Sequence, residues 1–238
     1  MRDPVRVIVV VVVLVVVAGA LRSASSHSAA PSSRPRSPVA GADYRLDAAT
    51  AQRVGARFLS PEARRATFRF DGVAPLDQQV FLSAVAAARP EARRLIGLVD
   101  GLVSVSVGPT GPAALGVTAA YDGAYAMRID LATVTARLGQ AGVDRVVLHE
   151  LGHVVDFALL PDDLTTALDA GIPRGWGCQD GKLGSCASRE ERFAESFAKW
   201  ATGDIGVNID AGYKVPPPGP TLDAWGAPLA PFGLPGGA

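Results

Sequence analysis

The chain has 238 residues, with 23 basic and 23 acidic side chains and therefore no net formal charge. This balance gives no support to a nucleic-acid-binding function or to binding at an anionic membrane surface, so we expect no nucleic-acid partner. Apolar residues make up 48% of the sequence, which is enough for a hydrophobic core, and the length fits one domain with short appendages.

The N-terminal residues have the pattern of an export signal. Two arginines precede an unbroken apolar run, Val7 to Ala18, and small residues follow it. A membrane-spanning helix needs about 20 apolar residues, so residues 1–20 are typical of a signal peptide, with an uncleaved signal anchor as the alternative. We therefore expect a secreted or extracytoplasmic protein that contacts a membrane only through such an anchor. Residues 21–42 are rich in Ser, Pro, Ala and Arg and predict a disordered tether.

The remaining residues, 43–238, are expected to form one α+β domain. Apolar periodicity predicts helices at 47–57, 75–89, 132–139, 143–160, 162–170 and 188–202. Alternation of β-branched and smaller residues predicts strands at 102–108, 114–122 and 124–131. Asp122-Gly123 is a strong hairpin signal between the last two strands. The Pro- and Gly-rich tail from Gly203 is expected to lack regular structure.

Cys178 and Cys186 are the only cysteines in the chain. An even number of cysteines in an exported chain favours a disulfide between them, closing a short glycine-rich loop. Zinc binding by the pair is the alternative, but a structural zinc site needs four ligands and nothing nearby in the sequence supplies the other two.

The sequence HELGH, residues 149–153, places two histidines four residues apart on the most hydrophobic predicted helix. Residues at i and i+4 share one face, so His149 and His153 point the same way from a buried helix. Burying unpaired polar groups is costly, and a divalent metal satisfies both imidazoles together. Glu150 is placed to take a proton from a metal-bound water as general base. The alternative is a helical module without metal, in which both histidines bond to backbone groups.

A catalytic zinc site also needs a third protein ligand. The only other histidine, His27, falls in the tether, so this ligand must be a carboxylate or a less usual donor. Glu191 and Glu195 share one face of the last predicted helix and are the best candidates, although a solvated charged stripe is the alternative for them. Asp156, one turn after the second histidine, is placed to orient a histidine ring.

HELGH, followed about forty residues later by ERFAESF, resembles the paired motifs of gluzincin-type zinc metallopeptidases. The similarity is greatest to the catalytic domain of anthrax lethal factor and related small zincin-like domains, and it covers roughly residues 100–202. It implies a zincin-like fold, in which a small mixed sheet with an edge strand accompanies a central HExxH helix and a C-terminal ligand helix. It implies three zinc ligands, His149, His153 and Glu191. It makes Glu195 the hydrogen-bond partner of a ligand histidine. The resemblance also extends past the HExxH motif along the same helix as far as Asp156.

In this family the bound peptide lies along an edge strand that precedes the HExxH helix, and residues 114–131 fill that position here. The lethal-factor domain also has a tyrosine seven residues before its ligand glutamate, as general acid or oxyanion donor, but Gly184 stands there in this chain. Tyr213 is our first choice for that role and Tyr125 the second, with a backbone N–H as the alternative. Trp176 and the cysteine loop are expected at the rim of the cleft.

The resemblance predicts a secreted zinc endopeptidase with Zn²⁺ as cofactor and a peptide or protein as substrate. Glu150 would activate a zinc-bound water. The alternative is a zincin-fold binding or structural protein at the cell surface that keeps its zinc without turnover. The presence of Glu150 favours the enzyme, because a site kept for structure alone needs no base.

Overall fold

The computed structural model describes residues 68–111, 114–121, 124–174, 187–205, 215–219 and 221–231. Several expectations from the sequence lie outside these ranges: the export signal, the tether, the helix at 47–57, the Asp122-Gly123 turn, Trp176, both cysteines, Gly184 and Tyr213. Within the described ranges the chain is a mixed α+β structure, as expected.

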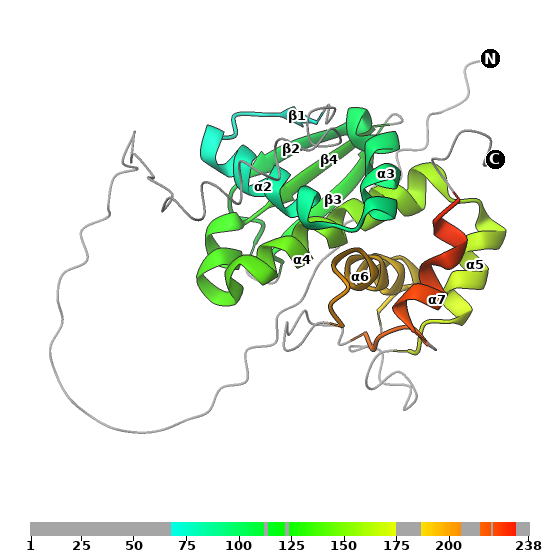
Figure 1. The fold of residues 1–238 in the computed structure, drawn as a ribbon. Helices are drawn as coiled ribbons and strands as arrows, with labels where there is room; N and C mark the ends of the chain where they lie inside the picture. The colour runs from blue at the N-terminus through cyan, green and yellow to red at the C-terminus, as the bar shows by residue number, and fades with distance from the viewer. Residues whose placement is uncertain are drawn as a thin grey trace, which may run out of the picture.

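Four strands form one small mixed sheet (Figure 1). Their order across the sheet is β1 (Arg69–Phe70), β2 (Val103–Val107), β4 (Ala124–Ile129) and β3 (Gly116–Tyr121). β1 pairs with β2 and β2 with β4 in parallel, whereas β3 pairs antiparallel with β4. The three predicted strands are confirmed, and β1, which has two residues, was too short to predict. Because β3 pairs on one side only, it is an edge strand of the described sheet.

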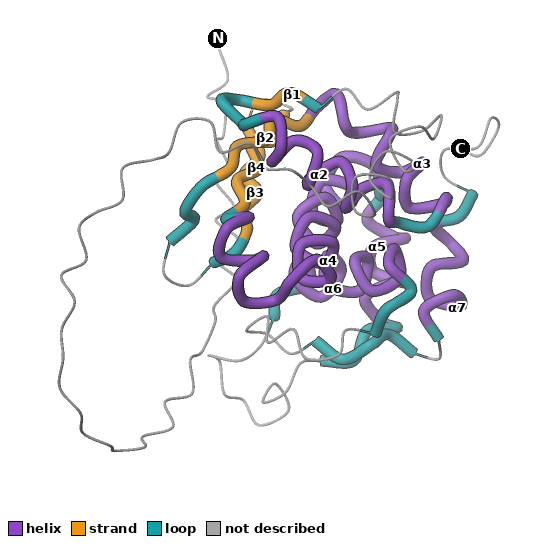
Figure 2. Tube along the Cα trace, turned by 60° about the vertical axis from the view of Figure 1, so that its left-hand side comes forward, coloured by secondary structure: helices purple, strands orange, loops and turns teal. Residues whose placement is uncertain are grey.

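The helices surround a central one. They are α2 (Pro75–Ala87), α3 (Pro90–Val99), α4 (Leu131–Leu159), α5 (Asp162–Ala170), α6 (Arg189–Thr202) and α7 (Leu222–Gly226), with 3-10 turns at Asp100–Leu102 and Ala227–Leu229. α4 contacts α2, α3, β3, β4 and α6. Figure 2 shows α4 and α6 side by side, with the sheet to one side of them and α5 and α7 to the other. Among the helices of the described ranges, none combines the length and the apolar character that a bilayer crossing needs.

The two helices predicted at 132–139 and 143–160 are both present, joined into α4 across a kink. Gly139 lies at the kink with φ 65° and ψ −163°, a backbone conformation that favours glycine. The helices predicted at 75–89, 162–170 and 188–202 are confirmed. Ser188 is the N-cap of the last of these helices, because its side chain accepts a hydrogen bond from the Glu191 N–H at 3.4 Å.

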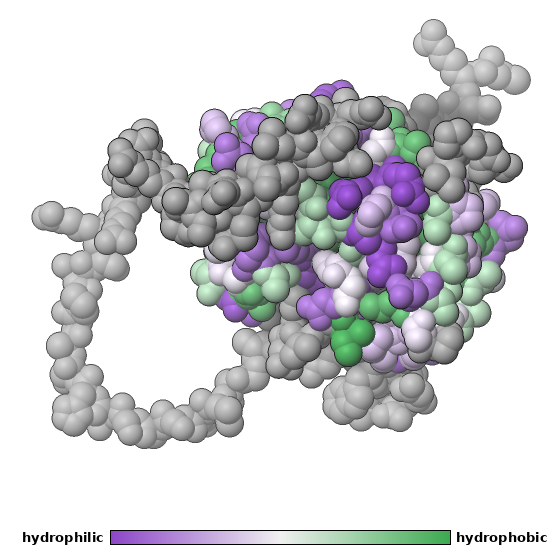
Figure 3. Space-filling view, viewed as in Figure 1, coloured by the Kyte–Doolittle hydropathy of each residue, from purple (hydrophilic) through white to green (hydrophobic). Residues whose placement is uncertain are grey.

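The sequence reading missed α3. α2 ends shortly before Pro90, which occupies the first turn of α3, where no intrahelical hydrogen bond needs the N–H that proline lacks. Leu95, Ile96 and Val99 are buried on one face of this helix. Its outer face contributes to the hydrophilic side chains that gather over α3 in Figure 3.

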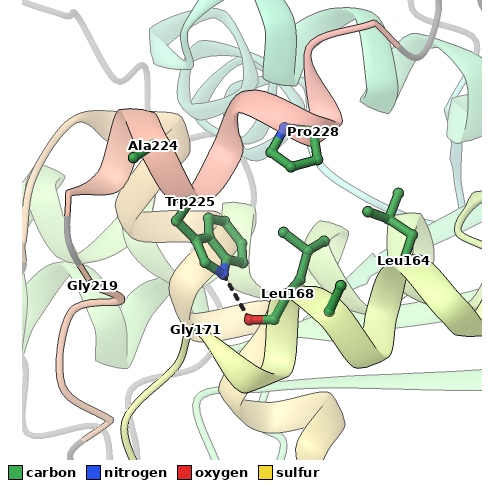
Figure 4. A pocket seen from close by; sticks show the side chains of 8 residues that line it. Leu164, Leu168, Gly171, Gly219, Ala224, Trp225 and Pro228 are labelled. Carbon is green, nitrogen blue, oxygen red and sulfur yellow. Dashed lines mark hydrogen bonds between the residues drawn. The ribbon is translucent and has the colours of Figure 1, made fainter.

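The expectation that the tail from Gly203 lacks regular structure is wrong for α7. Thr221 caps this short helix by accepting the Ala224 N–H at 3.1 Å. The Trp225 indole then packs against α5 and donates its Nε1–H to the Leu168 carbonyl at 3.1 Å (Figure 4). The buried Trp225 thus helps to attach the tail to α5, beside a small apolar pocket of about 210 Å³ between α5 and α7.

α4 and α6 approach closely at one point, where Gly152 of α4 lies against Ala194 of α6. A Cβ added to Gly152 would lie 3.0 Å from the Ala194 Cα and 3.2 Å from its carbonyl oxygen. Such a methyl does not fit without movement of the helices. The glycine of HELGH therefore lets the histidine face of α4 lie directly against the first turns of α6.

We predict that Gly152→Ala lowers the free energy of unfolding by about 1–2 kcal/mol, because the added methyl overpacks the α6 backbone. Gly97→Ala is the matched control, since Gly97 is exposed on α3 and its added Cβ meets nothing within 4 Å. This control is expected to be neutral or stabilising by up to about 1 kcal/mol through helix propensity. Denaturant unfolding measures both, and equal effects would contradict the close α4–α6 contact.

Candidate metal centre

Three side chains from two helices converge at the α4–α6 contact: His149 and His153 from α4, and Glu191 from α6. The two imidazole Nε2 atoms lie 3.3 Å apart. Glu191 Oε2 lies 3.2 Å from His149 Nε2, and Glu191 Oε1 lies 3.7 Å from His153 Nε2. All three residues are buried. Donor atoms around a tetrahedral zinc ion are about 3.3 Å from one another, and three protein ligands leave one position open. The donor set therefore fits a zinc ion.

Glu195 lies behind this cluster and is held by several donors. Its Oε2 is 3.2 Å from His149 Nδ1. Arg145 reaches both carboxylate oxygens, with Nη2 2.6 Å from Oε1 and Nε 3.4 Å from Oε2, and Lys199 Nζ is 3.3 Å from Oε1. Burial alone would raise the pKa of Glu195, but His149, Arg145 and Lys199 hold it well below its usual range. Glu195 is therefore a fixed acceptor for the His149 Nδ1–H, which directs Nε2 toward Glu191.

The surroundings of the two glutamates differ. Among the described residues, the ion-pair partners of Glu191 are His149 and His153 alone, and no lysine or arginine holds it. Glu195 has its oxygens engaged by two cationic side chains. Glu191 is therefore the carboxylate that no lysine or arginine engages and that could bind a metal, whereas Glu195 contacts the far side of the His149 ring.

Arg145 and Lys199 also bind backbone that follows α6. Arg145 Nη1 donates to the Asp204 carbonyl at 3.1 Å, and Lys199 Nζ donates to the Val215 carbonyl. Both cations are buried. They connect the end of α6 and the segment at Val215 to the carboxylate behind the metal-binding donors.

The sequence reading did not identify these two cations, although their spacing was visible. Arg145 lies one helical turn before His149, and Lys199 one turn after Glu195. Each therefore extends a series of residues at i and i+4 along the face that carries the site. A solvated stripe through Glu191 and Glu195 would also include Lys199, but in the structure this side chain is 3% exposed.

The electrostatics of the cluster favour positive charge between the donors. Burial lowers the pKa of His149, but the hydrogen bonds that its ring donates to Glu191 and Glu195, together with the charges of the nearby carboxylates, outweigh burial and raise the pKa to about 10. The pKa of His153 is lowered by its burial and by His149. The carboxylates thus attract one positive charge to the point where the three donors meet, which also suits a metal cation.

Glu150 lies beside the cluster, against β3. The Thr118 hydroxyl donates to Glu150 Oε2 at 2.7 Å, whereas Oε1 has no hydrogen-bond partner among the described residues. Burial raises the pKa of Glu150 to about 7, against the lowering effects of His149 and of the Thr118 hydrogen bond. A carboxylate that titrates near neutral pH, with one unengaged oxygen, is suited to accept and release a proton.

Asp156 and Tyr125 were both candidates for supporting roles at the site, and the structure shows what surrounds each of them. Asp156 Oδ1 pairs with Arg189 Nη1 at 3.0 Å, and no hydrogen bond between Asp156 and either histidine is found among the described residues. Asp156 therefore joins α4 to the start of α6. Tyr125 is buried on β4, and burial and the charge of Asp156 raise its pKa. Tyr213 and the two cysteines lie outside the described residues.

Comparisons of the chain with protein-family models, curated proteins and solved structures gave no match. We therefore interpret the chemistry of the site from its own donor atoms, distances and charges.

We predict that Glu191 and Glu195 respond differently to isosteric neutralisation. Glu195→Gln weakens zinc binding about 10- to 100-fold as a support residue, and Glu191→Gln weakens it more as a ligand. Glu195→Gln also destabilises the zinc-free protein by about 3 kcal/mol, because Arg145 and Lys199 remain buried without their carboxylate. Glu191→Gln is expected to destabilise the zinc-free protein by less, because no lysine or arginine depends on this carboxylate.

Chelator competition measures the zinc affinities, and denaturant unfolding measures the stabilities. Glu190→Gln is the matched control from the same turn of α6, since Glu190 is half-buried and pairs with Arg189 away from the cluster. The reverse order of the two zinc affinities would contradict the assignment of Glu191 as ligand.

Proposed function

We propose that this protein is an exported zinc-dependent endopeptidase of gluzincin type with a zincin-like domain. The observation that supports this most directly is the buried group of His149, His153 and Glu191 beside the Glu150 carboxylate. The arrangement of elements is compatible with the proposal. A small mixed sheet ends in an edge strand, the HExxH helix lies next to that strand, and a second helix brings the third donor.

Each residue of the site has a role in peptide hydrolysis. A zinc ion held by His149, His153 and Glu191 would supply Lewis acidity, which lowers the pKa of water and polarises a peptide carbonyl. Glu150 takes the proton of the attacking water at its unengaged Oε1 and passes it to the leaving amine nitrogen. Glu195 retains the His149 Nδ1 proton and keeps that ring oriented through both steps.

The edge strand β3 is the proposed binding place for the substrate. One side of β3 pairs with β4, and its other side is unpaired in the described sheet. An extended peptide adds to such an edge through backbone hydrogen bonds, with little dependence on side-chain sequence. Thr118 and Gly116 of the same strand contact Glu150, so a peptide on β3 lies close to the base. The substrate class is therefore an extended segment of peptide or protein.

The decisive test combines zinc content with cleavage of a degenerate peptide library, followed by mass spectrometry. We expect about one equivalent of zinc and measurable cleavage in the wild-type protein. Glu150→Gln should keep its zinc and lose about 10²- to 10⁴-fold in activity, because only the base is removed. Cleavage that survives this substitution would refute the mechanism. Zinc binding without any cleavage would identify a zincin-fold binding protein, and failure to bind zinc would exclude both functions.

The oxyanion donor is tested by a pair of tyrosine substitutions. Tyr213→Phe is expected to lower kcat about 10- to 100-fold with little change in KM, since the phenol acts on developing charge. Tyr125→Phe should have a small effect, because no hydrogen bond from Tyr125 to a residue of the site is found in the described part of the chain. Steady-state kinetics on one cleaved library peptide measures both. A larger effect at Tyr125 would reverse the order of our two candidates.

A further inference from the structure

We propose that Gly116 and Thr118 of the edge strand are positioning residues for Glu150. Together they form a seat that holds one oxygen of the carboxylate and leaves the other unengaged. We call these two residues the carboxylate seat. Its catalytic consequence depends on the proposed function, whereas its effect on the Glu150 side chain does not.

Thr118 supplies the polar half of the seat. Its hydroxyl donates to Glu150 Oε2 at 2.7 Å, and the alternative acceptor, the Glu150 carbonyl oxygen, is farther away at 3.4 Å. Thr118 is 2% exposed and Glu150 is fully buried, so water does not compete for this bond. Hydrogen bonds to an ionised carboxylate are about twice as strong as neutral ones. The β-branched side chain also has few χ1 rotamers, which fixes the direction of the hydroxyl.

Gly116 supplies the steric half of the seat. Residues two apart on a strand face the same way, so Gly116 and Thr118 both face α4. A Cβ added to Gly116 would lie 2.7 Å from Glu150 Cγ and 2.8 Å from Cδ, and closer still to Oε1. Such contacts are too short for any side chain, so glycine alone leaves room for the carboxylate against the strand.

The two halves act on different atoms of one group. Thr118 engages Oε2, and the bare backbone at Gly116 lies against the side of the carboxylate that carries Oε1. Oε1 then remains without a hydrogen-bond partner among the described residues. In the proposed reaction the edge strand therefore has two tasks. It binds the peptide by its unpaired edge. It sets the position of the base with Gly116 and Thr118, which face α4.

The test uses two variants of the full-length protein. Thr118→Val keeps the shape of the side chain but removes its hydroxyl, and Thr118→Ser keeps the hydroxyl but removes the methyl group. Thr118→Val is expected to lower kcat about tenfold or more, at unchanged KM and unchanged zinc affinity, and Thr118→Ser to recover most of that loss. In a Glu150→Gln background, Thr118→Val should cause no further loss, because its partner is already altered. Ser106→Ala is the control, since it removes a hydroxyl of the neighbouring strand β2 that bonds the Met127 carbonyl.

A second measurement is independent of turnover. In protein labelled with ¹³C at the glutamate carboxyl carbons, the Glu150 resonance is assigned as the one that Glu150→Gln removes. This resonance should shift in Thr118→Val and in Gly116→Ala and stay in place in Ser106→Ala, with or without zinc. Gly116→Ala keeps the test available if Thr118→Val does not fold.

An unshifted resonance in both seat variants would overturn the proposal, as would a loss of kcat that Thr118→Ser does not recover. If the wild-type protein binds zinc but cleaves no peptide, the proposed function fails, and the resonance still decides whether the seat exists.

Discussion

The close contact of α4 with α6 is the constraint on which the rest of the site depends. Neither helix alone carries enough donors for a catalytic zinc, since α4 supplies two histidines and α6 one available carboxylate. Gly152 against Ala194 lets the helices approach closely. The same contact buries Glu191 and Glu195 together with Arg145 and Lys199. This core contains two carboxylates, two histidines and two cations. The free-energy cost of burying these charges is offset because nearly every charge has a partner.

The sheet contributes to the site from the opposite side. β3 lies against α4 at Glu150, so the carboxylate proposed as general base is contacted by the strand, whereas the candidate metal ligands lie on the two helices. The side chains of the candidate metal ligands and the Glu150 carboxylate therefore rest on different contacts, although His149 and Glu150 share the backbone of α4.

Much of this site could be predicted because it is built from helical spacing. His149 with His153, and Glu191 with Glu195, are pairs at i and i+4, and local periodicity decides which face they share. The partners of Asp156 and Glu150 could not be predicted in this way. Arg189 and Thr118 meet these carboxylates only through the packing of separate elements. The helix α7 was missed for the same reason, since its buried Trp225 gains a partner only against α5.

In the function that we propose, two imidazoles and one carboxylate hold a zinc ion. X-ray absorption at the zinc edge of the zinc-loaded protein tests it most directly. The account predicts four nitrogen and oxygen neighbours at about 2.0–2.1 Å, two of them with the multiple scattering of imidazole rings and one from water. Sulfur neighbours at about 2.3 Å, or a first shell without two imidazoles, would contradict it.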